Sequence, residues 1–257
     1  VGDTGAPPPA AALAVLAERW AGIRGGLAPL LDEDANTIEI GRGDYESLLA
    51  ALHERRPFPE IARMLAAWAL EPMALRLARV AEQSRRIARR VGKGELDIEI
   101  RDHDLRLDPA LWSSFWSSFI HVVRNAVDHG LERADERVRA GKPERARLLL
   151  ESRIDDGELV IAIEDDGRGI DLHALTAAAA RFGIAARTPE QALAAMFHDG
   201  VTTASTSSEV SGRGIGMGAV RSACAALGGR VVTRSEPGKY TRFEFRFPPQ
   251  HAFAHAA

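Results

Sequence analysis

Three polar residues recur at intervals of four within the segment HVVRNAVDHGLE, residues 121–132. They are His121, Asn125 and His129, and Asp128 lies beside them. Because an α-helix has about 3.6 residues per turn, this spacing predicts a polar helix face opposite an apolar one. An asparagine oxygen suits a hard cation such as Mg²⁺, and the imidazoles can take up protons or contact phosphate. The same pattern also occurs on ordinary solvated helices, so it does not decide the function alone.

Two glycine-rich motifs follow this helix along the chain. The first, DDGRGID at 165–171, follows a predicted strand, where Asp165 can accept a hydrogen bond from an exocyclic amine such as that of adenine. The second, GRGIGMG at 212–218, precedes a predicted helix, whose N-terminal amides favour an anion. Its glycines alternate, which fits neither a Rossmann turn nor a P-loop. Each glycine motif alone is also typical of a plain turn, but the order of the three motifs predicts a nucleotide site.

The elements that must position these motifs can be read from the spacing of apolar residues. Helical spacing predicts helices over 11–31, 44–52, 71–91, 108–130, 133–140, 171–182, 189–197 and 219–227. Alternation predicts strands over 37–40, 95–100, 148–154, 159–164, 230–234 and 241–247, with a hairpin turn at 155–157. Residues 198–211 are small and polar, which predicts a mobile loop. The motifs therefore lie at the ends of predicted elements.

Composition bounds the class of protein. The chain of 257 residues is long enough for one large domain or two small ones, and its formal net charge is −3. Without a basic excess, neither nucleic acid nor a membrane surface is an expected partner. The single cysteine, Cys224, excludes an intramolecular disulfide and favours a reducing compartment, so we expect a cytoplasmic protein. The chain begins without Met, and we expect a fragment of a larger protein.

The motifs HVVRNAVDHGLE, DDGRGID, MFHDGVTTAS and SGRGIGMG together resemble the N, G1, F and G2 boxes of CheA-type chemotaxis histidine kinases, members of the GHKL ATPase superfamily. The resemblance runs from Glu71 to Pro248 and includes AGKPE at 140–144. It implies an α/β Bergerat fold, a two-layer sandwich with a mixed sheet, here preceded by a helical segment. It also implies transfer of the γ-phosphate of ATP, with Mg²⁺, to a histidine in bacterial two-component signalling.

The resemblance implies a role for each matched residue. Asn125 would hold Mg²⁺, and His129, a second catalytic residue, would contact the phosphates or brace the Mg²⁺ site. His121 would act as general base or orienting group where other GHKL members have Glu. Asp165 would bind the adenine amine, and a lid over 197–211 would close on the triphosphate. The other residues expected to bind nucleotide are Asp128, Gly167, Gly169, Ile170, Thr202, Thr203, Gly212, Arg213, Gly214, Ile215, Gly216 and Met217.

Four parts are expected along the chain. Residues 1–10 are rich in Pro, Gly and Ala and predict a disordered lead. Residues 11–65 predict a helical segment for dimerisation or docking, 66–249 the CheA-like catalytic domain, and 250–257 a frayed tail. His53 begins HERRPF, which is similar to the phosphorylated-histidine motif of sensor histidine kinases but lacks one residue before the proline. An exposed histidine near a helix end is the favoured interpretation of His53.

The expected partners follow from what the chain does not contain. No phosphotransfer domain is recognisable, so the acceptor histidine would lie on a separate phosphotransfer domain or on a missing part, with a response regulator downstream. A second copy would bind through the N-terminal helices. Gly218 stands where the family usually has Asp, which would lower activity. Two alternatives stay open: an ATP-binding pseudokinase or scaffold, and a GHKL ATP hydrolase, against which His121 in place of Glu argues.

Overall fold

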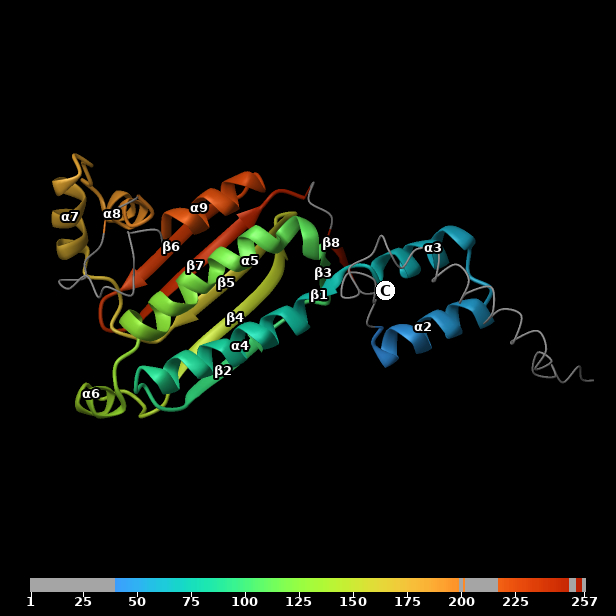
Figure 1. The fold of residues 1–257 in the computed structure, drawn as a ribbon, viewed down its shortest axis with the longest axis horizontal. Coiled ribbons are helices and arrows are strands. Elements are labelled where there is room, and N and C mark those ends of the chain that lie inside the picture. The colour runs from blue at the N-terminus through green and yellow to red at the C-terminus, as the bar shows by residue number, and fades with distance from the viewer. Residues whose placement is uncertain (1–39, 199–200, 202–216, 250–252, 256–257) are drawn as a thin grey trace, which may run out of the picture.

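A mixed sheet of five strands forms the centre of the computed structural model, which describes residues 40–198, 201, 217–249 and 253–255 (Figure 1). Its order is β2 (Leu96–Arg101), β4 (Ala146–Asp155), β5 (Glu158–Asp165), β7 (Tyr240–Phe247) and β6 (Arg230–Glu236). β2 runs parallel to β4, and the other neighbours are antiparallel. The β4–β5 turn has positive φ at Asp156 (52°) and Gly157 (79°), as expected for the predicted hairpin.

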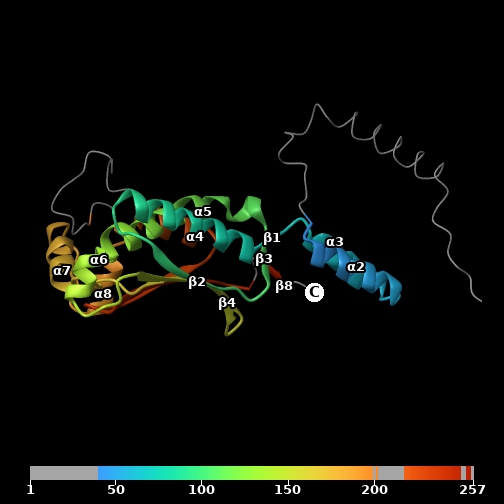
Figure 2. The ribbon, with the colours of Figure 1, turned by 90° about the horizontal axis from the view of Figure 1, so that it is seen from below.

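Three helices lie along one face of this sheet (Figures 1 and 2). They are α4 (Met73–Arg90), α5 (Pro109–Arg124) and α9 (Met217–Ala226). Aromatic rings fasten α5 to the sheet: Trp112 meets Phe247 edge to face with centroids 4.6 Å apart, and Phe115 meets Phe245 at 5.3 Å. All four rings are fully buried. The expected two-layer α/β sandwich with a mixed sheet is confirmed.

The other face of the sheet carries ion pairs. The Arg242 guanidinium bonds Glu244 (2.8 Å), Glu164 (3.2 Å) and Glu151, and Arg246 bonds Glu158 at 2.9 Å. Val160 and Ala162 alternate with the core residues of β5 and therefore point to this face, yet both are completely buried. The long charged side chains thus lie over this face, and no helix of the described residues covers it (Figure 2).

A small sheet joins segments that are far apart in the chain. β3 (Leu105–Leu107) pairs antiparallel with β1 (Glu71–Pro72) on one side and with β8 (Phe253–His255) on the other. The expectation of a frayed tail is therefore wrong at residues 253–255. Strands of two or three residues are too short to show a period, which explains why the sequence pattern did not reveal them. The helix predicted over 71–91 begins only at Met73, because residues 71 and 72 form the strand β1.

An antiparallel helical hairpin precedes the small sheet. Helices α2 (Arg42–His53) and α3 (Phe58–Ala67) pack through Leu48, Ala51 and Met64. The helix predicted to start at Asp44 begins two residues earlier, at Arg42, with Gly41 as its N-cap. Asp44 therefore lies inside α2, and its carboxylate accepts a hydrogen bond from Arg106 of β3 at 2.5 Å. This ion pair connects the hairpin to β3 of the small sheet. The predicted lead (1–10) and helix (11–31), and residues 37–39 of the predicted strand, lie outside the described residues.

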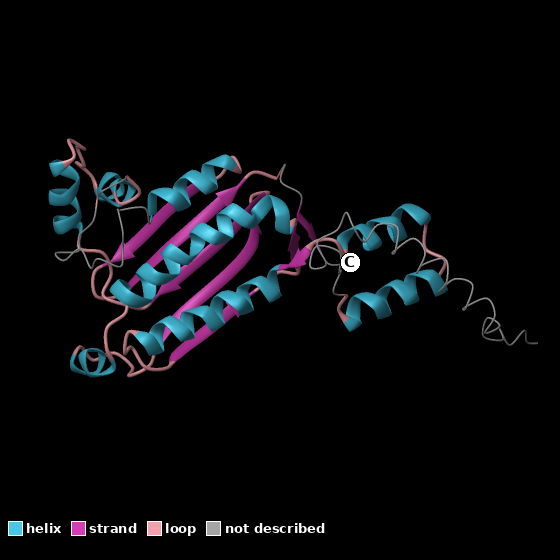
Figure 3. Ribbon diagram, viewed as in Figure 1, coloured by secondary structure: helices cyan, strands magenta, loops and turns pink. Residues whose placement is uncertain are grey.

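Three short helices complete the described part of the chain (Figure 3). They are α6 (Ala134–Arg139), α7 (Leu172–Arg181) and α8 (Pro189–Ala195), and they lie at the end of the sheet opposite the α2–α3 hairpin (Figures 1 and 2). The Asp171 side chain caps α7, and the Thr188 side chain caps α8. None of the helices described here is long and apolar enough to cross a membrane.

Candidate functional site

The helix that carries the polar row changes its winding within that row. α5 ends at Arg124, and Asn125–Gly130 continue as the π-helix η3. The Leu131 amide donates to the Ala126 carbonyl, five residues back, at 2.9 Å. The prediction of an α-helix through residue 130 is therefore wrong from Asn125 onward. π-turns of this kind are rare and often accompany functional sites.

The polar side chains of this segment are available for a ligand. His121, Asn125 and Asp128 are partly buried and His129 is exposed, and none of the four forms a side-chain hydrogen bond with a described residue. The described residues hold no group of three His, Cys, Asp or Glu that could bind a metal alone. One asparagine oxygen nevertheless suits Mg²⁺, which usually keeps several waters and shares its ligands with nucleotide phosphates. The residues present thus fit a metal that arrives with a nucleotide.

Asp165 is a buried carboxylate at the end of a central strand. It is the last residue of β5, is 2% exposed, and accepts a hydrogen bond from the Gly167 amide at 3.0 Å. Burial raises the pKa of Asp165 to about 7, and the neighbouring carboxylates of Asp166 and Glu132 act in the same direction. A buried carboxylate with unused acceptor capacity can receive a hydrogen bond from an amine.

The end of η3 lies directly against the turn that follows Asp165. A Cβ on Gly130 would lie 3.1 Å from the Asp165 carboxylate, and a Cβ on Gly167 would lie 2.2 Å from the Gly130 carbonyl oxygen. The Arg168 amide donates to that same carbonyl at 2.9 Å. Only glycines allow the two backbones to approach this closely. The contact brings the two sequence motifs together, so that Asp165 lies beside the helix that carries Asn125.

The β6–β7 hairpin supports the same turn from its other side. The Ile170 amide donates to Ser235 Oγ at 2.8 Å, and the Gly238 amide donates to the Arg168 carbonyl at 2.7 Å. Gly169 has a φ of +71°, and a Cβ there would lie 2.5 Å from the Glu236 carbonyl oxygen. Close packing of the backbone therefore explains why glycine is required at 167 and 169. Their contact with a bound base stays a prediction.

A buried ion cluster beneath the turn was not predicted from the sequence. The Arg137 side chain is fully buried and bonds Asp166 Oδ2 (2.7 Å), Glu132 Oε2 (3.2 Å) and the Pro143 carbonyl (2.8 Å). Lys142 Nζ donates to Glu132 Oε1 (2.8 Å) and to the Asp166 and Gly167 carbonyls (3.0 and 2.6 Å). Lys142 thus holds the two residues that directly follow Asp165 in the turn. The AGKPE segment was the available signal, but it indicated no role.

Thr241 is a second residue that sequence reasoning missed. It lies directly opposite Asp165 in the β5–β7 pair and is 4% exposed. Its hydroxyl is 3.2 Å from that of Ser235, which in turn supports Ile170. Directly opposite residues in antiparallel strands are neighbours, so Thr241 provides a buried hydroxyl beside the carboxylate. Thr241 lies in the segment SEPGKYTRF, residues 235–243, for which the sequence pattern predicted a strand but no function.

The remaining predicted contacts are only partly described. Met217 is the first residue of α9 and is 8% exposed, packed in the hydrophobic core. Of the lid predicted over 197–211, the structure describes Phe197, His198 and Val201. Phe197 is buried in the main core, and Val201 is buried beside Leu175. The other predicted contacts of the lid and second glycine motif lie outside the described residues, namely Thr202, Thr203, Gly212, Arg213, Gly214, Ile215 and Gly216. They stay predictions.

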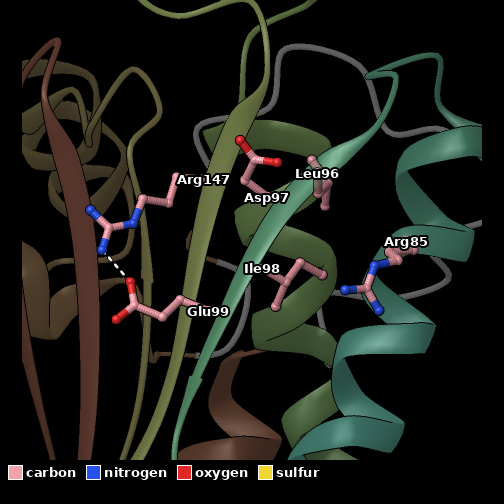
Figure 4. Close-up of a pocket in the computed structure, with 6 residues that line it drawn as sticks. All are labelled: Arg85, Leu96, Asp97, Ile98, Glu99 and Arg147. Atoms are coloured by element: carbon pink, nitrogen blue, oxygen red, sulfur yellow. Dashed lines mark hydrogen bonds and ion pairs between the residues drawn. The ribbon is translucent and has the colours of Figure 1, made fainter.

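A recess at the edge of the sheet is separate from these motifs (Figure 4). It lies over the edge strand β2, and Arg147 extends to Glu99 across it in an ion pair. The residues that line it are Arg85, Leu96, Asp97, Ile98, Glu99 and Arg147. None of them is among the predicted site residues, and the acids are already paired with arginines. We therefore assign no part of the site to this recess.

The family of the chain follows from this geometry and from comparison with known proteins. Residues 117–251, slightly more than half of the chain, match the family model described as Histidine kinase-, DNA gyrase B-, and HSP90-like ATPase. The chain belongs to this family. Within it, the ATPase domain is of the CheA type, as the relatives show.

Three relatives illustrate the likeness. The chain is 32% identical to chemotaxis protein CheA of Cereibacter sphaeroides over 197 residues, which cover 75% of this chain and 28% of that protein. It is 31% identical to CheA of Rhizobium meliloti over 226 residues, 85% of this chain and 28% of the relative. It is 36% identical to the gliding motility regulatory protein of Myxococcus xanthus over 170 residues, 64% and 22% of the two chains. The chain therefore spans only about a quarter of the length of these relatives.

Among solved structures, the histidine kinase domain from the Erythrobacter litoralis EL346 blue-light activated histidine kinase covers 80% of this chain and 82% of its own. The TM-score is 0.41 and the identity 17%. This superposition is too loose to support a conclusion about this chain.

Proposed function

We propose that this chain is the catalytic module of a histidine protein kinase. It would bind Mg-ATP and transfer the γ-phosphate to a histidine on a phosphotransfer domain. The observation that carries the proposal is the junction at Gly130, where the helix bearing His121 and Asn125 ends against the buried carboxylate of Asp165. Membership of the ATPase family supports ATP as the nucleotide, and the CheA relatives support a kinase of two-component signalling.

Each residue has one task in this proposal. Asp165 accepts a hydrogen bond from the adenine amine, and Asn125 offers its oxygen to Mg²⁺. The bound metal neutralises phosphate charge, which together with positioning supplies most of the rate in such transfers. His121 accepts the proton of the acceptor imidazole or orients that ring. A free imidazole nitrogen then forms a bond to the γ-phosphorus, the bond from that phosphorus to the β–γ bridging oxygen breaks, and ADP leaves.

The other predicted contacts complete the nucleotide site in the same proposal. Asp128 and His129, on the same π-helical turn as Asn125, face the phosphates and the metal. Ile170 lines the base, since it follows the Asp165 turn and packs against the core. The predicted contacts outside the described part of the chain, from Thr202 to Gly216, would cover the triphosphate together with Met217 at the start of α9.

The N-terminal hairpin is proposed to bind a second copy of the chain. Helices α2 and α3 use Leu48, Ala51 and Met64 for their own contact but leave other apolar side chains exposed, namely Tyr45, Leu49, Leu52, Phe58 and Leu65. Such a patch is unusual on a monomer and typical of an interface. Multi-angle light scattering across a concentration series tests this, and a mass that stays monomeric at every concentration contradicts it.

The proposed reaction is tested with γ-labelled ATP and Mg²⁺. The chain is incubated with each histidine-phosphotransfer domain encoded in the same genome, beside a His121→Ala variant. Acid-labile label on an added domain, absent with the variant, supports a kinase that acts on a separate acceptor. Tight ATP binding without label favours the pseudokinase or scaffold, and free phosphate released without acceptor favours a hydrolase. Label on the chain itself would direct attention to His53, which ends α2 and is exposed.

A further inference from the structure

A groove separates the two helices α4 and α5 on the helical side of the molecule. Its volume is about 450 Å³. α4 and α5 lie side by side on the sheet (Figures 1 and 2), and both begin at the small sheet, since β1 leads directly into α4 and β3 precedes α5. The residues lining the groove are Arg79, Gln83, Arg86, Ile87, Arg90, Ile120 and Arg124.

The lining has the pattern of a helix-binding surface. Arg79, Gln83, Arg86 and Arg90 are spaced by four, three and four residues, so they form one row along α4. A row of this length extends about 16 Å along the helix. Two partly buried isoleucines line the groove beside this row, Ile87 on α4 and Ile120 on α5. An apolar strip beside a polar row is what an amphipathic helix needs in order to lie in a groove.

The groove has a strong excess of positive charge, although the whole chain has a net charge of −3. Residues 71–90 contain six arginines and only two glutamates. Glu71 is engaged by Arg76 and Arg79, and Glu82 is at 3.6 Å or more from its nearest arginines. Arg90 and Arg124 have no acidic partner among the described residues. Negative charge on a partner would therefore meet unneutralised guanidinium groups here.

The groove ends at the proposed site of transfer. Ile120 and Arg124 lie on either side of His121 on α5, and Arg124 directly precedes Asn125. Arg90 and Arg124 are the last residues of their helices, so the most basic end of the groove lies at the end that adjoins η3. An acceptor histidine must come to this end of α5 in order to receive a phosphate held near Asn125.

We propose that this groove docks an acidic helix of the phosphotransfer domain, and that its arginine row selects the acceptor. The proposal rests on the proposed function, whose acceptor it describes. A protein helix fits better than nucleic acid or a lipid surface, because the isoleucine strip would be left unmatched by a phosphodiester backbone and is too narrow for a membrane. Guanidinium groups pair well with carboxylates, which supports acidic side chains as their partners.

Two double variants of the same helix test this inference. Arg86→Glu with Arg90→Glu reverses charge inside the groove, whereas Arg85→Glu with Arg89→Glu makes the same change at residues of α4 that do not line it. Label transfer is measured against acceptor concentration, and ATP affinity is measured separately. The groove pair should raise the KM for the acceptor domain at least about fivefold, since like charges would then face each other. ATP affinity and the rate at saturating acceptor should stay unchanged, and the control pair should change KM less than about twofold.

The outcomes separate this inference from the proposed function. Equal KM changes in both pairs, or none in either, overturn the docking site. If the parent labels no acceptor domain, the kinase proposal fails, and direct binding of the same domains is measured by titration calorimetry. If the groove pair then binds a domain more weakly than the parent and the control pair do, the docking site is still supported. If all three proteins bind equally well, or if the parent binds no domain, the docking site is overturned. The docking site is also overturned if the groove pair weakens binding to single-stranded DNA or to phosphatidylserine vesicles but leaves binding to the phosphotransfer domain unchanged. Acidic-to-lysine changes on the acceptor helix should restore KM for the groove pair.

Discussion

The affinity for ATP should depend on pH through Asp165. Burial raises the pKa of this carboxyl to about 7, and only the ionised form is a full acceptor for an amine. A group with this pKa is about one-tenth protonated at pH 8 and about nine-tenths protonated at pH 6. ATP affinity should therefore fall roughly tenfold between pH 8 and pH 6, equivalent to about 1.4 kcal/mol.

Titration calorimetry at constant ionic strength and saturating Mg²⁺ measures this slope. The Asp165→Asn variant is the control, because its amide stays neutral and yet keeps nearly the same shape. This variant should bind ATP more weakly than the parent by roughly 1–3 kcal/mol at pH 8. Its ATP affinity should change with pH only by the small amount that titration of the ATP phosphates contributes in both proteins. Equal slopes for the parent and the variant would refute the reasoning, and equal affinity of the parent for ATP and GTP would remove adenine recognition from Asp165.

The same raised pKa predicts the opposite trend for the stability of the protein without nucleotide. Between pH 3.8, the ordinary value, and about 7, the folded state binds more protons at Asp165 than the unfolded state. The free energy of unfolding from this group should therefore decrease as the pH rises through that window. Urea unfolding of the parent and of Asp165→Asn across this pH window measures the difference between their free energies of unfolding. This difference should become smaller toward low pH, and a difference that grows toward low pH would contradict the prediction.

Three substitutions test the rest of the site. Gly167→Ala should destabilise the fold by roughly 1–3 kcal/mol, because its Cβ would lie 2.2 Å from the Gly130 carbonyl oxygen; urea unfolding checks this against Gly43→Ala, whose Cβ would meet nothing. Lys142→Met leaves the Gly167 carbonyl without its donor and the Asp166 carbonyl with only the bond from Arg137 at 3.3 Å, so ATP affinity should fall roughly tenfold in calorimetry; full affinity would contradict the bracing role. Asn125→Ala should remove the gain in nucleotide affinity that Mg²⁺ gives, and an unchanged Mg²⁺ dependence would sink the metal assignment.

Local signals in the chain predicted most of the regular elements. The helices covering the sheet and the strands of the β4–β5 hairpin follow from apolar period, and the turn at Asp156-Gly157 follows from its residue types. These predictions hold because periodicity and turn preference depend on neighbours in the sequence. The predictions failed for the small sheet. Its strands β1, β3 and β8 are too short to show a period, and each is a strand only because it pairs with another of the three.

The candidate site divides in the same way. The residue types of the motif helix and of the DDGRGID turn were sufficient to predict a nucleotide site, and the family match agrees with that class. The sequence could not predict that Gly130 and Gly167 touch, nor that Lys142 holds the turn, because these contacts join residues that are 37 and 25 positions apart. The π-turn at Asn125 likewise has no local signal.

By itself, the sequence determined which residues could bind a metal, an amine or a phosphate, since these capacities belong to side chains. Only the tertiary structure decided which of them share a site. The buried position of Asp165, and with it the pKa near 7, arises from packing of η3, β4 and β7 around the end of β5. The basic groove likewise exists only because α4 and α5, helices from separate parts of the chain, lie side by side on one sheet. Burial and proximity depend on the whole fold, and no local pattern encodes them.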